Sequence, residues 1–194
     1  MNSTGKRTNI DVKKLVYLAI LTALVCILQI VSNITQTVLP VPITLTLVPI
    51  VLGVALCGRW SGVWLGFAFG VMVILSGASE PFFTINPFGT VVTVLLKGML
   101  AGLVAGLVYS LLEGKNRYLA ILLAGVAAPL VNTGVFLIGC FVFFYDYVLT
   151  LANGEALFLF IITVFVGVNF LVELLLNMVL SPTILRLLNI KKPQ

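Results

Sequence analysis

Lys97 is a charged residue inside an otherwise apolar stretch, GTVVTVLLKGMLAGLVAGLVYSLL, that covers residues 89–112. This stretch is long enough to cross a bilayer as a helix. A lysine in hydrocarbon costs roughly 2.5 kcal/mol on insertion scales, so it normally faces a partner, a cavity or a ligand. Thr93 lies one turn away on the same face, beside glycines at every fourth position from Gly98 to Gly106. Lys97 is therefore predicted to point into a helix bundle.

Two other apolar stretches carry polar residues at positions that a helix would place on one face. Asn132 lies at the centre of AAPLVNTGVF, and Asn169, Glu173 and Asn177 follow at intervals of four residues. With about 1.5 Å of rise per residue, Lys97, Asn132 and Asn169 come near one level, and Glu173 lies about one turn deeper. A cation and two amides at one level predict a pocket for a small solute with an anionic group.

Glu173 offers a second interpretation of Lys97, a structural pair in which two buried charges neutralise each other. An intermediate arrangement is one in which Glu173 holds Lys97 until a substrate carboxylate arrives. The segment SGASEPFFTINPFG, which contains Phe83, precedes the Lys97 stretch. It is predicted to be either a lid over the pocket or a loop in the headgroup zone. The sequence leaves these alternatives open.

The elements that must position these residues follow from the composition. The chain has 194 residues, of which 61% are hydrophobic and 9% charged, with a mean hydropathy of +1.22. About a quarter of the residues are charged in a soluble domain, so an all-α integral membrane protein is predicted. Residues 1–194 form one membrane domain, with a basic arm at 1–14, a tail at 187–194 and six transmembrane helices at about 15–32, 43–57, 60–76, 88–112, 118–144 and 156–186.

Charge predicts how these six helices are oriented. Ten of the eleven basic residues lie in the segments of one face, and the opposite loops carry only Glu80, Asp146 and Glu155. Basic segments stay in the cytoplasm, so both termini are predicted to be cytoplasmic and the protein to lie in the cell membrane, N-in and C-in. Because this pattern accounts for the net charge of +5, no nucleic-acid binding is predicted.

Motifs for catalysis are missing from the sequence. The chain has no histidine, and no HExxH, CxxC, GxSxG or GxxxxGK[ST] occurs in it. Its three cysteines lie in or beside apolar stretches, where small core residues are the usual interpretation. We therefore predict no enzyme activity, no cofactor and no metal site. If the protein moves a solute by nucleotide hydrolysis, another chain must bind the nucleotide.

Nearly all of residues 10–190 resembles the substrate-binding S component of the energy-coupling factor (ECF) vitamin transporters of bacteria. The resemblance is carried by the basic arm before LAILTALV, by LVPIVLGVALCGRWSGVWLGFAFG and by APLVNTGVF. It implies a six-helix bundle with an outward pocket, working with a transmembrane T component and two ATPase subunits. In that family an AxxxA pair on the first helix contacts the T component, and here this pair is Ala19 and Ala23.

The resemblance is strongest to the pantothenate-specific branch. Pantothenate carries one carboxylate, one amide and two hydroxyls, which suit Lys97, Asn132 and Asn169. The predicted substrate-binding residues are these three with Thr93, Phe83 and Glu173. Riboflavin, folate or biotin are alternative substrates for such a subunit, and a self-contained small secondary transporter is an alternative function.

Overall fold

The structure is a computed structural model that describes residues 12–38, 45–153, 156, 160 and 167–189, without the side chains of 36–38, 168, 169 and 187–189. Throughout these residues the regular elements are helices. In chain order they are α1 (Val12–Val38), α2 (Leu47–Cys57), α3 (Arg59–Leu75), α4 (Glu80–Phe83), α5 (Pro87–Leu112), α6 (Arg117–Phe143), α7 (Tyr145–Ala152) and α9 (Gly167–Asn189). The described part of the chain is therefore all-α, as predicted.

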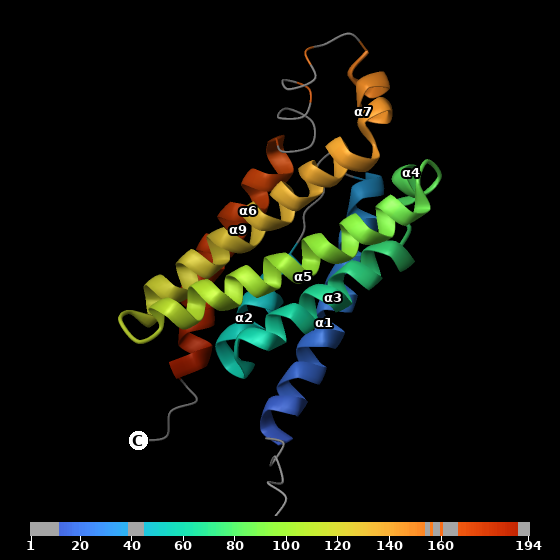
Figure 1. Ribbon diagram of the computed structural model, residues 1–194. Helices are drawn as coiled ribbons and strands as arrows, with labels where there is room; N and C mark the ends of the chain where they lie inside the picture. The colour runs from blue at the N-terminus through green and yellow to red at the C-terminus, as the bar shows by residue number, and fades with distance from the viewer. Residues whose placement is uncertain (1–11, 39–44, 154–155, 157–159, 161–166, 190–194) are drawn as a thin grey trace, which may run out of the picture.

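The short helix α2 lies inside the bundle. It packs against α1, α3, α5, α6 and α9 (Figure 1). More than half of its residues are buried, namely Leu47, Pro49, Ile50, Val51, Gly53 and Val54. A helix that is apolar all round belongs in a core rather than at a surface. The expectation that this short stretch is buried is confirmed, although the helix begins at Leu47, and residues 39–44 lie outside the described part.

Glycines at matching positions bring α3 and α5 into backbone contact. A Cβ at Gly66 would collide with the backbone carbonyl of Gly98, and a Cβ at Gly62 would collide with that of Gly102. The converse also holds, because a Cβ at Gly98 or Gly102 would meet the carbonyl of its partner. Small residues four apart allow membrane helices to approach this closely. The tight packing predicted from these glycines is confirmed, and it holds Lys97 of α5 next to α3.

Asparagine side chains determine where α5 and α6 begin. The Asn86 side chain accepts a hydrogen bond of 2.9 Å from the backbone N–H of Gly89. The Asn116 side chain accepts bonds of 3.0 and 3.1 Å from the N–H groups of Tyr118 and Leu119. Such caps satisfy N–H groups that have no partner within the helix. The α5–α6 turn lies at the end of the bundle where α1 begins, and α4 and α7 lie at the other end (Figure 1).

Two segments that were predicted as loops contain short helices. Helix α4 lies within the predicted loop at 76–88, and α7 lies within the predicted loop after the fifth span. Val148 and Ala152 form the buried face of α7, because apolar residues four apart share one side of a helix. Helices α3, α5 and α6 begin and end within one residue of the predicted spans, whereas α1 runs on to Val38. Residues 157–159 and 161–166 of the predicted sixth span lie outside the described part.

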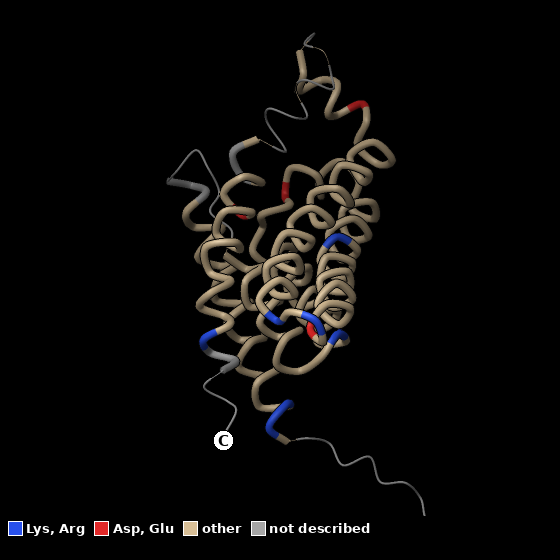
Figure 2. The backbone as a smooth tube through the Cα atoms, turned by 90° about the vertical axis from the view of Figure 1, so that its left-hand side faces the viewer, with Lys and Arg blue, Asp and Glu red and all other residues tan. Residues whose placement is uncertain are grey.

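In the described residues, three helical stretches are long and apolar enough to cross a membrane: Val12–Thr35, Pro87–Leu112 and Arg117–Phe143. Helices α2 and α3 are shorter apolar helices of 11 and 17 residues. Figure 2 shows most of the described Lys and Arg residues near the end of the bundle where α1 begins. The described part thus has a basic end, and the protein is a membrane protein.

Candidate functional site

The ammonium group of Lys97 lies between two aromatic rings. Its nitrogen is 5.2 Å from the centre of the Phe136 ring on α6 and 5.8 Å from the centre of the Phe69 ring on α3. A ring face attracts a cation, by about 2 kcal/mol where water is excluded, but it supplies no strong hydrogen-bond acceptor. Rings from two neighbouring helices therefore hold this one charge of α5.

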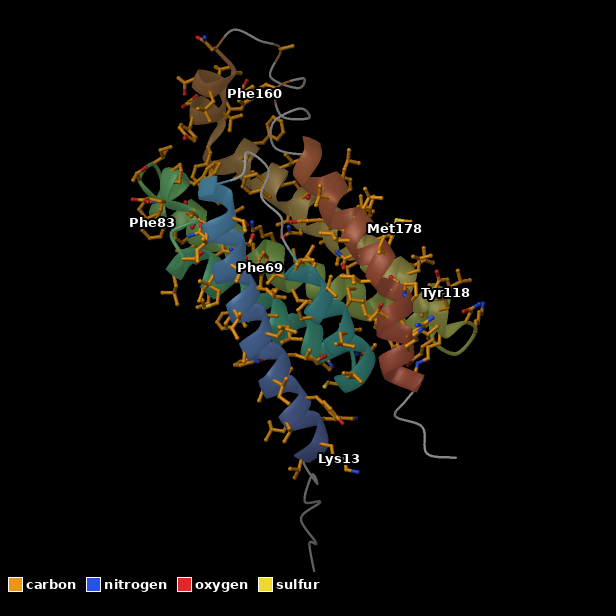
Figure 3. The ribbon with its side chains drawn as sticks, turned by 180° about the vertical axis from the view of Figure 1, so that it is seen from behind. Lys13, Phe69, Phe83, Tyr118, Phe160 and Met178 are labelled. Atoms are coloured by element: carbon orange, nitrogen blue, oxygen red, sulfur yellow. The ribbon has the colours of Figure 1, made fainter. Side chains whose placement is uncertain are left out.

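This site lies within the bundle rather than at either end. Figure 3 shows Phe69 between the end of the bundle marked by Lys13 and the end marked by Phe83. Phe69 is buried and Lys97 is half-buried. A lysine at such a position in a membrane protein normally faces a polar partner, a cavity or a ligand. The position of Lys97 inside the bundle, predicted from its sequence, is confirmed.

A group of aromatic side chains covers the Lys97 site toward the end with α4 and α7. The Phe82 ring of α4 meets the Phe136 ring edge-on, with ring centres 5.6 Å apart. Phe82 also packs against Phe144 at 5.1 Å and Tyr147 of α7 at 5.7 Å, again at steep angles. Edge-to-face contacts of this kind add about 0.5–1.5 kcal/mol each beyond the burial of area. Phe82 therefore ties α4 to α6 and α7 directly above the ring that holds Lys97.

Thr93 and Asn132 each carry a buried oxygen without a hydrogen-bond partner in the described residues. These atoms are Oγ1 of Thr93 and Oδ1 of Asn132. Thr93 is one turn from Lys97 on α5, and it packs against Gly139, where a Cβ would come within 2.9 Å of the threonine Cβ. Asn132 is one turn from Phe136 on α6. A buried oxygen that lacks a donor costs about 1–3 kcal/mol, so both atoms favour a bound polar group.

Helix α9 contributes a stripe of buried polar residues on the side that faces α6. Glu173, Asn177 and Ser181 are all buried. The Asn177 side chain donates a hydrogen bond of 2.8 Å to the Glu173 backbone carbonyl, and Ser181 donates one of 2.7 Å to the Asn177 carbonyl. Asn177 lies against Gly125 of α6, where an added Cβ would be 3.5 Å from the Asn177 Cβ. The predicted inward direction of Glu173 and Asn177 is confirmed, whereas the side chain of Asn169 lies outside the described residues.

A family model for the substrate-specific component of ECF transporters matches residues 13–185 of the chain. The chain belongs to this family. As an S component it is the vitamin-binding, substrate-specific subunit of a transporter. Comparison with curated proteins and with solved structures gave no match. The family is assigned from this sequence match. The site described above is formed by residues of this subunit, without any partner chain.

The rings that hold Lys97 were not foreseen as site residues of this S component. Phe69 and Phe136 resemble any other aromatic residue in an apolar stretch, although Phe136 lies on the same helical face as Asn132. Of the two loop phenylalanines, Phe83 is 38% exposed, whereas Phe82 makes the ring contacts. Across the α5–α6 contact, Lys97 lies opposite Phe136 and Thr93 lies opposite Gly139, while Asn132 is one turn from Phe136. The four-residue spacing between Asn132 and Phe136 was the feature of the sequence from which Phe136 could have been predicted to face the site.

The S component exposes the AxxxA pair of its first helix. Ala19 and Ala23 lie on the outer side of α1, where neighbouring Val16, Ile20 and Ile27 are at least half exposed. In the described residues α1 packs against α2 and α3, through Leu21 and Val25 on its opposite face. One side of α1 is thus buried in the bundle, and the side with the two alanines is available for contact.

The described part of the S component contains no group of three or more histidine, cysteine or acidic residues that could hold a metal ion. Cys26 and Cys57 are half-buried and Cys140 is buried, and no disulfide joins these three residues. The chemistry that the groups around Lys97 support is the binding of a small molecule. The site offers a cation with N–H donors and two ring faces, and the buried oxygens of Thr93 and Asn132 lie one helical turn from Lys97 and from Phe136 along their helices.

Proposed function

We propose that this S component captures a vitamin carboxylate from outside the cell through Lys97 and delivers it through a T component driven by two ATPase subunits. The observation that carries the proposal is the Lys97 ammonium, which lies between Phe69 and Phe136. The unpartnered oxygens belong to Thr93, one turn from Lys97 on α5, and to Asn132, one turn from Phe136 on α6. A carboxylate would provide the charged hydrogen-bond acceptor that two ring faces do not.

The proposed topology has six transmembrane helices, with both termini in the cytoplasm. It is supported by the separation of charge along the bundle: Arg59, Lys115 and Arg117 lie in the segments at one end, and Glu80 and Asp146 lie in α4 and α7. Basic residues mark the cytoplasmic side of a membrane protein. The end with α4 and α7 then faces outward, and Phe82 lies between the outside and the site.

Pantothenate is the substrate that we propose. Its carboxylate suits Lys97, and its amide and two hydroxyls suit a site with the polar side chains of Thr93 and Asn132. The walls formed by Phe69 and Phe136 suit the apolar carbons between these groups. Riboflavin, folate and biotin are the other candidates, and they belong in the same binding assay.

A structural pair of Lys97 with Glu173 is the competing interpretation of the site. The substitution Glu173→Gln separates the two. If Glu173 competes with the substrate for Lys97, acid binding becomes tighter in the variant, because the rival carboxylate is gone. If the pair holds the bundle together, the variant loses thermal stability and binds no more tightly, since an unpaired buried charge costs about 3–5 kcal/mol.

The proposed partners also follow from the surface of α1. A T component would bind the exposed side that carries Ala19 and Ala23, because small residues four apart permit close approach of another helix. The sequence contains no nucleotide-binding motif of the GxxxxGK[ST] type. Energy for uptake is therefore assigned to the ATPase subunits.

The experiment that tests the function is a panel of radiolabelled B vitamins presented to the solitary purified protein. We expect tight binding of an acidic vitamin from the outer side, no nucleotide hydrolysis, and uptake into proteoliposomes only when T and ATPase subunits are present. Concentrative uptake by this chain alone would instead make it a secondary transporter. Absence of binding by every acid in the panel would contradict the role of Lys97.

A further inference from the structure

Contacts between α5 and α6 set the order of the polar groups along the site. Thr93 faces Gly139, and the Lys97 nitrogen faces Phe136, so the two helices run antiparallel past each other. Asn132 is four residues beyond Phe136, which corresponds to about 6 Å along the helix axis. The groups therefore occupy three levels, with Thr93 one turn above Lys97, and Asn132 one turn below it on the opposite wall.

The three levels call for different hydrogen-bonding partners. The ammonium of Lys97 is purely a donor, so it needs an acceptor. The buried Oδ1 of Asn132 is purely an acceptor, and it has no donor among the described residues. The Thr93 hydroxyl can act in either way. A molecule that matches the site must therefore offer an acceptor at the level of Lys97 and a donor one turn deeper.

We propose that Asn132 selects the substrate among acids, by accepting a hydrogen bond from a hydroxyl or amide N–H that lies about one helical turn from the carboxylate. This inference rests on the proposed function and narrows it. The substrate class is a carboxylic acid that carries a second, uncharged donor group. A plain acid leaves the oxygen of Asn132 buried without a donor, and sites built around such an oxygen discriminate strongly against ligands that lack the donor.

The test compares two kinds of acid on the full-length protein in detergent. Pantothenate, biotin and folate each carry hydroxyl or N–H donors, whereas lipoate and nicotinate carry a carboxylate and no further donor. We expect a donor-bearing acid to bind at least about tenfold more tightly than either plain acid, which corresponds to one hydrogen bond. If lipoate or nicotinate binds most tightly, the proposal is overturned. If that binding is lost when Lys97 is replaced, the proposed function is still supported.

Two variants locate the effect at Asn132. Asn132→Leu keeps the size of the side chain and removes its acceptor, so the preference for the donor-bearing acid should fall to roughly twofold or less. Asn177→Leu is the matched control, because Asn177 is also buried with an unpartnered Oδ1 but lies two turns deeper, against Gly125. It should keep the preference. A preference that survives in Asn132→Leu, or disappears equally in both variants, would contradict the proposal.

Ligand analogues provide the same test without changing the protein. Methylation of the pantothenate amide nitrogen, or of either hydroxyl, removes one donor at a time. One of these methylations should weaken binding to the unaltered protein at least about tenfold, the cost of one hydrogen bond. Equal affinity for all three analogues and pantothenate would overturn the role of Asn132, even if Lys97 proves essential. If no acid binds at all, both the proposed function and the role of Asn132 are contradicted.

Discussion

Phe136 is in contact with Lys97 on one side and with Phe82 on the other. The Lys97 nitrogen lies 5.2 Å from the centre of the Phe136 ring, and the Phe82 ring meets Phe136 edge-on at 5.6 Å. A single side chain thus connects the charge of Lys97 to helix α4 at the end of the bundle. Changes in α4 can therefore reach Lys97 through one ring, and changes at Lys97 can reach α4.

Removal of the charge at Lys97 should weaken the binding of an acid selectively. Lys97→Met keeps an unbranched stem and removes the ammonium. Hydrogen bonds to charged groups contribute about 1.5–3 kcal/mol, so the dissociation constant for pantothenate should rise on the order of 10–100-fold. The uncharged amide analogue should be affected much less. Equal losses for the acid and the amide, measured by equilibrium binding, would support a structural role for Lys97.

Shortening Phe82 should make a bound ligand dissociate faster. Phe82→Ala removes the edge contacts with Phe136, Phe144 and Tyr147, so α4 loses its attachment to α6 and α7. Phe83→Ala is the control, because Phe83 lies in the same helix and is 38% exposed. Dissociation rates of radiolabelled vitamin are the measurement. If the two variants release ligand at the same rate, Phe82 does not cover the site.

A side chain at Gly66 should destabilise the bundle. Gly66→Ala places a Cβ against the backbone carbonyl of Gly98, and inserted atoms in a packed core cost about 1–3 kcal/mol. Gly134→Ala in α6 is the control, since a Cβ there meets nothing within 4 Å. Thermal unfolding in detergent should show a lower midpoint for Gly66→Ala and an unchanged or higher one for Gly134→Ala. Equal midpoints would show that α3 can move away from α5.

Bulky residues on the exposed side of α1 should stop uptake and leave binding intact. Ala19→Trp and Ala23→Trp would hold a partner helix away while changing residues that face out of the bundle. Leu130→Trp, at another exposed position on α6, is the control. Proteoliposome uptake with the T component and ATPases should be lost in the first two variants, with vitamin affinity unchanged in all three. Normal uptake in them would place the partner elsewhere.

The bundle and the direction of Lys97 could be predicted because a membrane restricts where polar and small residues are placed. A lysine in an apolar stretch has to turn inward, and glycines four apart on α3 and α5 have to face a neighbouring helix. These rules act on single residues, so one sequence is enough to apply them. The glycine contacts of Gly62 and Gly66 with α5 confirm the second rule.

The aromatic rings at the site could not be predicted in the same way. Hydropathy does not distinguish Phe69, which is buried against the core, from Phe88, which is 72% exposed. Which phenylalanine meets Lys97 depends on the register of α3 and α6 against α5, and packing alone sets that register. Helix α7 was missed for a related reason, because its burial depends on contacts of Val148 with the rings of other helices.

The interlocked glycines of α3 and α5 also determine what moves together. Lys97 is on one of these helices and Phe69 on the other, and both lie one turn or less from the points where carbonyls meet glycines. A sliding motion between α3 and α5 would drive backbone into backbone. The cation and the Phe69 ring beside it are therefore a preassembled rigid unit that keeps its dimensions in any orientation of the subunit in the bilayer. If the vitamin binds at Lys97 as proposed, its release has to come from movement of α6 or α4.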